Sequence, residues 1–417
     1  MPAQAEAQRA EAPPAAAKRW LEAGLGLCVL LLPVLLSLVP RGAAPLAAVA
    51  GLGAAGLIMA SPPWRLAALC QPAALLGILL LWGTVSAAWS IDPGRSLIMA
   101  ARLAGLFAGA LGLAGAAGRV AVPSRLSRFA LAGTAIGIAL ALGDLISGGG
   151  LSGFVSVRPF VAPRLNPFAV WLAVMMPPAA ALLWGRGERL LALAFAAAMA
   201  GTVCLLDGTA AKVALALSLP AVALLYLRRG ALVRLAAALS ILAILGAPLT
   251  LPRLASLPGV FADVDAFKSS AGHRLLIWSF AGDRIAERPF VGWGLDSARA
   301  IPGGKDEIRP GQSWLPLHPH DAGLQVWLEL GAPGAALFAL LVGWLWWRLA
   351  TVTWPRLYAA AAGGSLAAAL AAAFSAWGIW EEWWLATLGL ALFVIIVMAR
   401  AADPSAAGAT PPPPQRG

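Results

Sequence analysis

Long apolar runs, separated by short polar breaks, make up most of this chain. Apolar runs of about 18 or more residues predict membrane-spanning helices, because each is long enough to cross the hydrocarbon core of a bilayer. The pattern therefore predicts an all-α polytopic membrane protein with about twelve transmembrane helices. The predicted spans are residues 21–40, 43–60, 67–88, 96–117, 128–147, 166–185, 189–206, 210–227, 231–250, 322–347, 357–377 and 383–400.

Composition supports the same class of protein. Of the 417 residues, 60% are hydrophobic and only 12% are charged, whereas a soluble domain is roughly half apolar and about a quarter charged. Cys28, Cys70 and Cys204 all fall inside apolar runs, so neither a disulfide framework nor a metal cluster is predicted. The sequence also has no P-loop, GxSxG or HExxH motif. These absences argue against a hydrolase and a metal-dependent transferase, and we expect neither metal nor cofactor.

Positive charge is distributed unevenly between the two sides that the spans define. The formal net charge is +11, and arginines gather in alternate breaks at positions such as Arg119, Arg125, Arg128, Arg228, Arg229, Arg348 and Arg356. By the positive-inside rule, these breaks and both termini are cytoplasmic. The Pro- and Ala-rich ends, residues 1–20 and 401–417, are predicted to be disordered cytoplasmic tails. The sequence shows no basic stretch interleaved with aromatic residues, so we expect no nucleic-acid partner.

The longest polar segment, residues 251–321, is predicted to lie on the opposite side of the membrane. It divides nine predicted spans in residues 21–250 from three in residues 322–400. At about 70 residues, it is far longer than an ordinary connection and is expected to be functional. Within it, Ser270 is expected to cap a helix that ends before Pro289. The apolar side of that helix, which would face the membrane surface or close over a cavity, consists of Leu275, Ile277, Trp278 and Ile285.

All three histidines lie in or near this segment, so acid–base chemistry is sought there first, because the pKa of histidine lies near 7. His320 directly precedes a span and is a candidate general base that takes a proton from a hydroxyl. The alternative is a loop histidine that solvates the helix end. His318 precedes Pro319, which favours an extended backbone, and either orients a substrate or is exposed. Asp321 either raises the pKa of His320 or caps the following helix.

Four cations are predicted on the side that holds little positive charge: Arg158, Arg164, Lys212 and Arg274. Each either reaches toward anionic lipid headgroups or binds a ligand that carries phosphate. Arginine suits a diphosphate because its guanidinium donates hydrogen bonds in pairs. The alternative for Lys212 is a local ion pair with Asp207, across a very short break.

Three acidic residues stand out in or beside the last predicted spans. Glu329 falls inside a span, and a carboxylate there is a functional candidate by default. It is about two and a half turns from His320, or ~13 Å further into the membrane, so we expect it to pair structurally with another helix. Glu381 and Glu382, in GIWEEWW, are expected to be interfacial and solvated.

Several of these segments resemble the O-antigen ligase and O-antigen polymerase superfamily. The stretch HPHDAGLQVWLELGAPG is similar to its signature of a histidine followed after ten residues by glycine, here His320 and Gly331. The upstream GHRLLIWSFAGDRIAERPFVGWGLDSA resembles its Arg-x-x-x-Trp helix and Pro-x-x-Gly-x-Gly turn, and VRPFVAPRLNPFAVWLAV resembles its Arg-rich loop. Two positions depart from the ligase pattern: Lys212 stands where ligases usually show arginine, and Asp321 where asparagine or serine is common.

The resemblance implies a GT-C-like transferase in the inner membrane of a bacterium. It would move a glycan from undecaprenyl diphosphate to a hydroxyl of lipid A-core or of a growing glycan, on the periplasmic side, among membrane lipids. The implied roles are a base at His320 and loop or acceptor positioning by His318, Asp321 and Gly331. The implied diphosphate ligands are Arg274, Arg164, Lys212 and Arg158.

Two alternatives stay open. One is a polymerase of O-antigen or exopolysaccharide repeat units, which belongs to the same superfamily. The other is a transporter of polysaccharide or lipid, which would show internal repeats or several ionisable residues at mid-membrane. Neither feature is clear in the sequence, where Glu329 and Asp144 are the plausible acids in or near a span.

Overall fold

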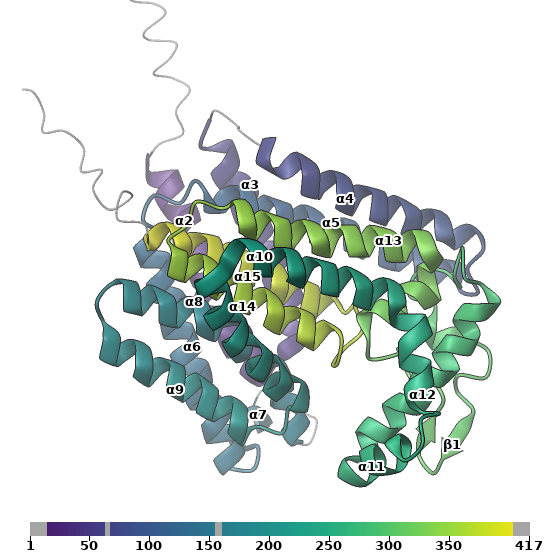
Figure 1. The fold of residues 1–417 in the computed structure, drawn as a ribbon. Coiled ribbons are helices and arrows are strands. Elements are labelled where there is room, and N and C mark those ends of the chain that lie inside the picture. The colour runs from purple at the N-terminus through teal and green to yellow at the C-terminus, as the bar shows by residue number, and fades with distance from the viewer. Residues whose placement is uncertain (1–14, 63–66, 155–160, 403–417) are drawn as a thin grey trace, which may run out of the picture.

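The computed structural model describes residues 15–62, 67–154 and 161–402, and most of these residues are helical (Figure 1). Within these ranges, ten helices are long and apolar enough to cross a membrane. This confirms the prediction of an all-α polytopic membrane protein. Most of both predicted tails and Arg158 lie outside the described residues.

Each of the twelve predicted spans falls on a helix or on one arm of the kinked helix α10. The number of helices that cross the membrane stays a prediction. The α-helices are α2 Ala15–Leu38, α3 Ala43–Met59, α4 Ala67–Val85, α5 Pro93–Ala117, α6 Pro123–Ile146, α7 Gly150–Gly153, α8 Asn166–Gly185, α9 Arg189–Leu205, α10 Thr209–Leu254, α11 Val260–Phe267, α12 Ser269–Glu287, α13 Ala322–Thr351, α14 Arg356–Ala373 and α15 Glu382–Ala401. The short elements are the 3-10 helices η1 Pro40–Gly42, η2 Ser86–Ala88, η3 Ala162–Leu165 and η4 Ala298–Ala300, and the antiparallel strands β1 Glu307–Arg309 and β2 Gln312–Ser313.

Helix α10 consists of two arms that meet at Arg228, whose φ of −140° and ψ of 54° are not helical. Figure 1 shows the arms meeting at an angle, with the second arm leading toward α12. Carbonyls at the end of the first arm lack partners within the helix. Arg356 supplies them, because its guanidinium donates to the carbonyls of Tyr226 (2.6 Å) and Leu227 (3.0 Å). The arms correspond to the separately predicted spans 210–227 and 231–250.

Helix α8 forms the centre of the bundle and is buried along most of its length. It contacts α2, α9, α10, α14 and α15. Small residues make such close packing possible, since they let helix backbones approach one another. On α14, Ser365 donates from its hydroxyl to the carbonyl of Val174 on α8 (2.7 Å). On α6, Gly133 lies directly against the backbone of Leu30.

Helix α12 lies at the end of the bundle where residues 255–321 gather, which we refer to as the loop end (Figure 1). It packs against α10 and α13. The expected Ser270 cap is wrong: the helix begins at Ser269, the capping residue is Lys268, and no side chain caps it. It ends at Glu287, before Pro289, as predicted. Its buried side includes Leu275, Ile277 and Ile285 of the predicted apolar set, whereas Trp278 is only half-buried.

Helix α13 is interrupted at Gly331, whose φ of 63° and ψ of −163° lie outside the helical region. The turn after α12 passes through this break, where the amide of Gly294 donates to the carbonyl of Glu329 (2.8 Å). The two backbones lie so close together here that neither Gly331 nor Gly292 could carry a side chain without a clash. A Cβ on Gly331 would meet the carbonyl of Phe290, and one on Gly292 would meet the carbonyl of Glu329. The neighbouring carbonyls of Leu328 and Leu330 accept hydrogen bonds from the Trp293 amide (2.9 Å) and from Trp82 Nε1 (2.8 Å).

Candidate active site

His320 holds an unusual backbone conformation beside the first turn of α13. Its φ of 57° is in the left-handed region, which residues other than glycine rarely adopt. Its ring atom Nδ1 lies 2.5 Å from the carbonyl oxygen of Ala376, in the segment between α14 and α15. Because a carbonyl can only accept, Nδ1 carries the proton, and Nε2 keeps a free lone pair. The geometry therefore fixes the tautomer that a general base requires.

The surroundings keep this imidazole neutral at pH 7. Burial lowers the pKa of His320 to about 4. The hydrogen bond to Ala376 opposes this shift, whereas the charges of Arg274 and His273 reinforce it. His318 is more strongly affected: burial lowers its pKa to about 2, with contributions from His320, Arg299 and Arg274.

The two histidines of the signature contact each other. The backbone amide of His320 donates to Nδ1 of His318 (3.2 Å), and the ring centroids are 4.3 Å apart. Because Nδ1 of His318 accepts this bond, the proton of its neutral ring is on Nε2. His318 is buried, so of its two predicted states, orienting or exposed, the exposed one is wrong.

Helix α12 presents one face to this histidine loop. Arg274 and Trp278 are four residues apart and so lie on the same face. Trp278 Nε1 donates to the carbonyl of Pro319, between the two histidines (2.9 Å). His273 Nε2 lies 2.8 Å from the carbonyl of Ser313, which makes Nε2 the donor. Trp278 of the Arg-x-x-x-Trp pattern, together with His273, thus ties α12 to the segment that leads to His320.

Arg274 is half-buried and forms no hydrogen bond or ion pair with any residue that the structure describes. Burial lowers the pKa of its guanidinium, which still stays charged at neutral pH because free arginine titrates above about 12. Its charge acts on both His318 and His320. A partly desolvated cation without a partner is suited to an anionic ligand.

Asp321 is the N-cap of α13, where its Oδ1 accepts from the amide of Leu324 (2.8 Å). Burial raises the pKa of this carboxyl to about 7, although the backbone of Leu324 and Gly323 opposes the shift. The sequence left two roles open for Asp321, raising the pKa of His320 or capping the following helix, and the structure shows the cap. The groups that shift the pKa of His320 do not include Asp321.

Arg164 and Lys212 lie apart from this cluster. Arg164, on η3, donates to the carbonyl of Leu38 (2.5 Å), and its second terminal nitrogen, Nη1, is buried without a partner among the described residues. Lys212 is exposed in the first turn of α10, and the predicted alternative pair with Asp207 is not among the ion pairs of the described chain. Neither cation bonds to His320 or Arg274 in that part of the chain.

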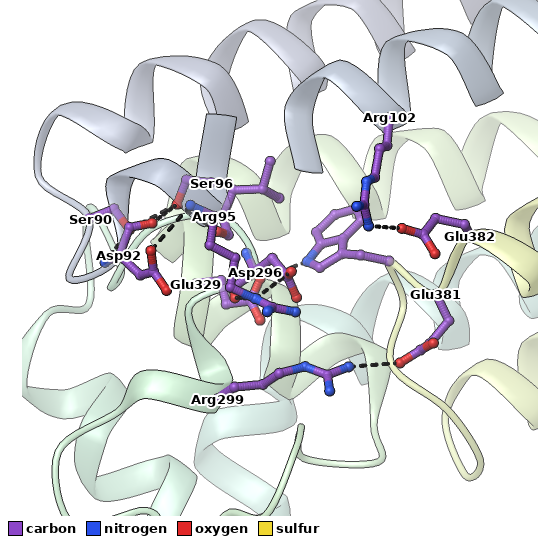
Figure 2. Close-up of polar contacts among 12 residues, drawn as sticks. Ser90, Asp92, Arg95, Ser96, Arg102, Asp296, Arg299, Glu329, Glu381 and Glu382 are labelled. Carbon is purple, nitrogen blue, oxygen red and sulfur yellow. Dashed lines mark hydrogen bonds and ion pairs between the residues drawn. The ribbon is translucent and has the colours of Figure 1, made fainter. Parts of the chain in front are cut away.

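A cavity of about 140 Å³ lies beside His318. Figure 2 shows the charged side chains that converge on it from α5, from the loop before α13 and from the start of α15. Glu381 pairs with Arg299 (3.0 Å) and Glu382 with Arg102 (2.5 Å). Both glutamates remain partly exposed, and the expectation of an interfacial, solvated location did not include these ion pairs. The lining residues are Arg95, Met99, Arg102, Asp296, Arg299, Leu317, His318, Gln325, Gly378, Trp380, Glu381 and Glu382.

Glu329 is fully buried behind this cavity. Its carboxylate accepts from Trp380 Nε1 (2.7 Å), Gln325 Nε2 (3.0 Å) and the amide of Asp296 (2.6 Å). Glu329 is thus held by hydrogen bonds, but the predicted pairing with another helix is wrong. Trp380 and Asp296 lie in loops, and Gln325 lies on α13 itself. Asp296 itself has a φ of 54° and pairs with Arg95 (2.8 Å).

The sequence interpretation did not assign a role to the residues that shape this region. Arg95 lies in the short break between the predicted spans 67–88 and 96–117, and Arg299 lies in the long polar segment, but nothing in the sequence places them together. Gly378 is a further example: a Cβ there would lie 3.1 Å from His318 and 3.3 Å from Gln325, so glycine leaves room for both side chains. The available signal was the presence of charged residues in a short break and in the polar segment 251–321, both on the side that holds little positive charge.

The fold and the site define a polytopic α-helical membrane protein with a neutral histidine and an unpaired arginine at its loop end. Comparison with known proteins connects this arrangement to a family. Residues 193–339 match the sequence profile of the O-antigen ligase family. That range contains Lys212, Arg274, His320 and Gly331, whereas Arg158 and Arg164 precede it. The resemblance seen in the sequence is confirmed over this region.

Three relatives from Rickettsia carry the name "Putative polysaccharide ligase". The protein of Rickettsia conorii is 47% identical over 81 residues, which cover 18% of this chain and 20% of the relative. Those of Rickettsia felis and Rickettsia prowazekii are 32% and 31% identical over 137 and 141 residues, which cover 32% of this chain and 33% of each relative. The aligned part thus spans between a fifth and a third of the relatives.

Proposed function

We propose that this protein is a glycosyltransferase of the O-antigen ligase kind. It transfers a glycan from undecaprenyl diphosphate to a hydroxyl of lipid A-core, on the periplasmic side of a bacterial inner membrane. The observation that carries the proposal is that a neutral His320 and the charged Arg274 lie near enough for the charge to act on the imidazole. The Ala376 carbonyl fixes the tautomer of His320, burial keeps the ring neutral, and the nearby charge of Arg274, which has no partner among the described residues, acts on it.

The reaction that a neutral His320 and a charged Arg274 support is a direct displacement. The acceptor oxygen attacks the anomeric carbon of the donor glycan while Nε2 of His320 takes the hydroxyl proton. The bond between the anomeric carbon and the diphosphate oxygen breaks, and undecaprenyl diphosphate leaves with the electron pair. Arg274 stabilises the negative charge on that leaving group.

Donor binding also tunes the base. In the free protein the charge of Arg274 lowers the pKa of His320. A diphosphate placed on Arg274 offsets that charge and adds negative charge nearby, so the pKa of His320 rises when the donor binds. The imidazolium formed by proton transfer is thereby stabilised only in the loaded site.

Lys212, Arg164 and Arg158 extend the phosphate-binding region in this proposal, and cationic side chains take the role that a metal has in other transferases. The support for Lys212 is its location. Lys268, which caps α12, donates to the hydroxyl of Thr209 (2.7 Å), in the same helical turn as Lys212. The first turn of α10 therefore touches the helix that carries Arg274.

A repeat-unit polymerase is the second candidate, because it uses the same chemistry with a growing glycan as the acceptor. Lys212 and Asp321, which depart from the ligase pattern, favour it. A transporter is less well supported. Glu329, an acid inside a predicted span, already accepts three hydrogen bonds, as expected of a structural carboxylate.

The proposal is tested with purified protein reconstituted in liposomes, supplied with an undecaprenyl-diphosphate glycan in the presence of EDTA. Glycan transferred to added lipid A-core would support the ligase. Lengthened lipid-linked glycan without added core would support the polymerase. The absence of both products would contradict a glycan transferase.

A further inference from the structure

The cavity beside His318 has a balanced set of charges. Its lining contains three arginines and three carboxylates, and His318 is neutral. Each arginine is paired, as Figure 2 shows: Arg95 with Asp296, Arg102 with Glu382, and Arg299 with Glu381. The lining therefore offers many hydrogen-bond donors and acceptors but no net charge.

This chemistry matches a neutral polyol. Sugar hydroxyls can donate to the carboxylates and accept from the guanidinium groups at the same time. Trp380, Met99 and Leu317 add apolar surface for the carbon atoms of a ring. A phosphate or carboxylate, in contrast, would find every cation already neutralised by its partner.

The cavity walls are held in place before any ligand binds. The arginines come from α5 and η4, whereas the carboxylates come from the loop before α13 and from the start of α15. Ion pairs that join separate elements fix the donor and acceptor positions, and preorganised groups lose less entropy when a ligand binds. Trp380 is further fixed by its hydrogen bond to Glu329.

The cavity adjoins the proposed reaction centre without including it. Neither His320 nor Arg274 lines the cavity, but His318 does. His318 accepts a hydrogen bond from the amide of His320, and their rings are 4.3 Å apart. The Nε2–H of His318 has no hydrogen-bond partner within the described part of the chain. A sugar in the cavity would thus lie one imidazole ring away from the base.

We propose that this cavity binds one neutral sugar residue of the acceptor glycan and discriminates against sugars that carry phosphate or carboxylate. The assignment of the sugar to the acceptor rests on the proposed function, because it uses the position of His320. The binding of a neutral sugar rests on the cavity alone.

Saturation-transfer NMR on the full-length protein in lipid nanodiscs tests the proposal. The probes are methyl glucoside, galactoside and mannoside, together with the corresponding hexose 6-phosphates and hexuronic acids. We expect at least one neutral methyl hexoside to receive saturation, and the anionic sugars to bind at least tenfold more weakly. If no neutral hexoside binds, or if the anionic sugars bind more tightly, the proposal is overturned.

Paired variants separate sugar binding from structural support. Arg299→Gln/Glu381→Gln removes one cavity pair without changing net charge and should weaken hexoside binding at least tenfold. Its matched control is Arg309→Gln/Asp265→Asn, an ion pair (2.9 Å) of similar exposure between β1 and α11 that does not line the cavity. The control should bind like wild type, and equal weakening in both variants would overturn the proposal. If the cavity variant does not fold, Leu317→Trp fills the cavity without breaking an ion pair.

A single substitution tests the charge argument. Glu381→Gln leaves the cavity with one uncompensated arginine, so it should shift the preference at least tenfold toward the hexose 6-phosphates or hexuronic acids. An unchanged preference would overturn the claim of discrimination.

Failure of this proposal is distinguishable from failure of the proposed function. Arg274→Ala should keep hexoside binding, since Arg274 does not line the cavity. Wild-type protein that binds a hexoside but transfers no glycan would contradict the transferase and leave the cavity as a saccharide site. Glycan transfer without hexoside binding would overturn the cavity proposal alone.

Discussion

Nδ1 of His320 lies 2.5 Å from the carbonyl oxygen of Ala376, which joins the loop before α13 to the segment between α14 and α15. This contact assigns the ring proton to Nδ1 and leaves Nε2 free to accept one. The second partner in the site is Arg274, whose charge disfavours a protonated His320 until an anion binds. The predictions below follow from this pair and from the backbone that supports it.

Arg274 is predicted to act on the donor diphosphate. Arg274→Ala should reduce kcat/KM for the lipid-linked donor by on the order of 100-fold, as expected for the loss of a group that stabilises developing charge. Arg274→Lys should recover part of this loss, because a point charge replaces a paired donor. Steady-state transfer kinetics with varied donor would measure both effects.

The control for Arg274 is Arg309, an arginine of the same polar segment, residues 251–321, that pairs with Asp265. Arg309→Ala removes a half-exposed ion pair worth about 0–1 kcal/mol of stability and should leave donor kinetics near wild type. Similar losses in the two variants would mean that Arg274 acts through the folding of the loop rather than through the donor.

The rate of glycan transfer should fall on the acid side only at unusually low pH. His320 must be neutral to act as a base, so activity is present above its folded-state pKa and is lost as pH falls through about 4. A histidine in water would give a limb near 6.5. Because bound diphosphate offsets the charge of Arg274, the limb in kcat should lie at higher pH than the limb in kcat/KM. Coincident limbs near 6.5 would contradict the tuning of His320 by burial and by Arg274.

Asp321 should make the free energy of unfolding decrease as the pH rises. Burial raises its folded-state pKa to about 7, above the value of about 3.9 in an unfolded chain. Its stabilising contribution is therefore full below about pH 4 and is lost as pH rises through 7. Asp321→Asn keeps a capping side chain and removes this dependence, whereas Asp321→Ala should cost about 0.5–2 kcal/mol by loss of the cap. Thermal unfolding between pH 4 and 8 would measure the difference, and parallel curves for wild type and Asp321→Asn would refute it.

Replacement of Gly331 by any other residue is predicted to destabilise the fold, because of its backbone conformation and its close contact with another backbone segment. Gly331→Ala puts a Cβ at a φ of 63° and against the carbonyl of Phe290. The strain should cost about 1–3 kcal/mol, seen as a lower unfolding temperature. Gly77→Ala is the matched control, since Gly77 lies inside α4 with nothing within 4 Å of an added Cβ. That variant should be unchanged or slightly more stable. Equal destabilisation in the two would contradict the role assigned to the break in α13.

The fold class and the helical segments were predictable because apolar length is a local property of the sequence. Even the two arms of α10 could be separated, since Arg228 and Arg229 interrupt the apolar run. The break at Gly331 could not be located in the same way. It depends on the turn around Gly294 entering α13, and that contact joins segments distant in sequence. The Ser270 cap failed for a local reason, because the helix starts two residues earlier than expected, with Lys268 at the cap position.

The candidate site was predictable only in part. His320 and Arg274 stand out as a histidine and a cation in a polar segment, and the structure brings them together. The role of Asp321 as a cap was one of two open alternatives until the Leu324 amide was located. The ion pairs of Glu381 and Glu382 escaped prediction, because their partners come from distant elements and charge alone does not specify pairing.

The central claim is that His320 is the base of a glycan transfer, and one kinetic comparison tests it most directly. His320→Asn is the sharpest variant, because asparagine tolerates a positive φ and has no basic nitrogen. With reconstituted protein and an undecaprenyl-diphosphate glycan, this variant should fold normally and bind donor with little change in KM. Its kcat should fall about 10²–10⁴-fold, the usual contribution of a general base. Transfer by the folded variant at the wild-type rate would contradict the account.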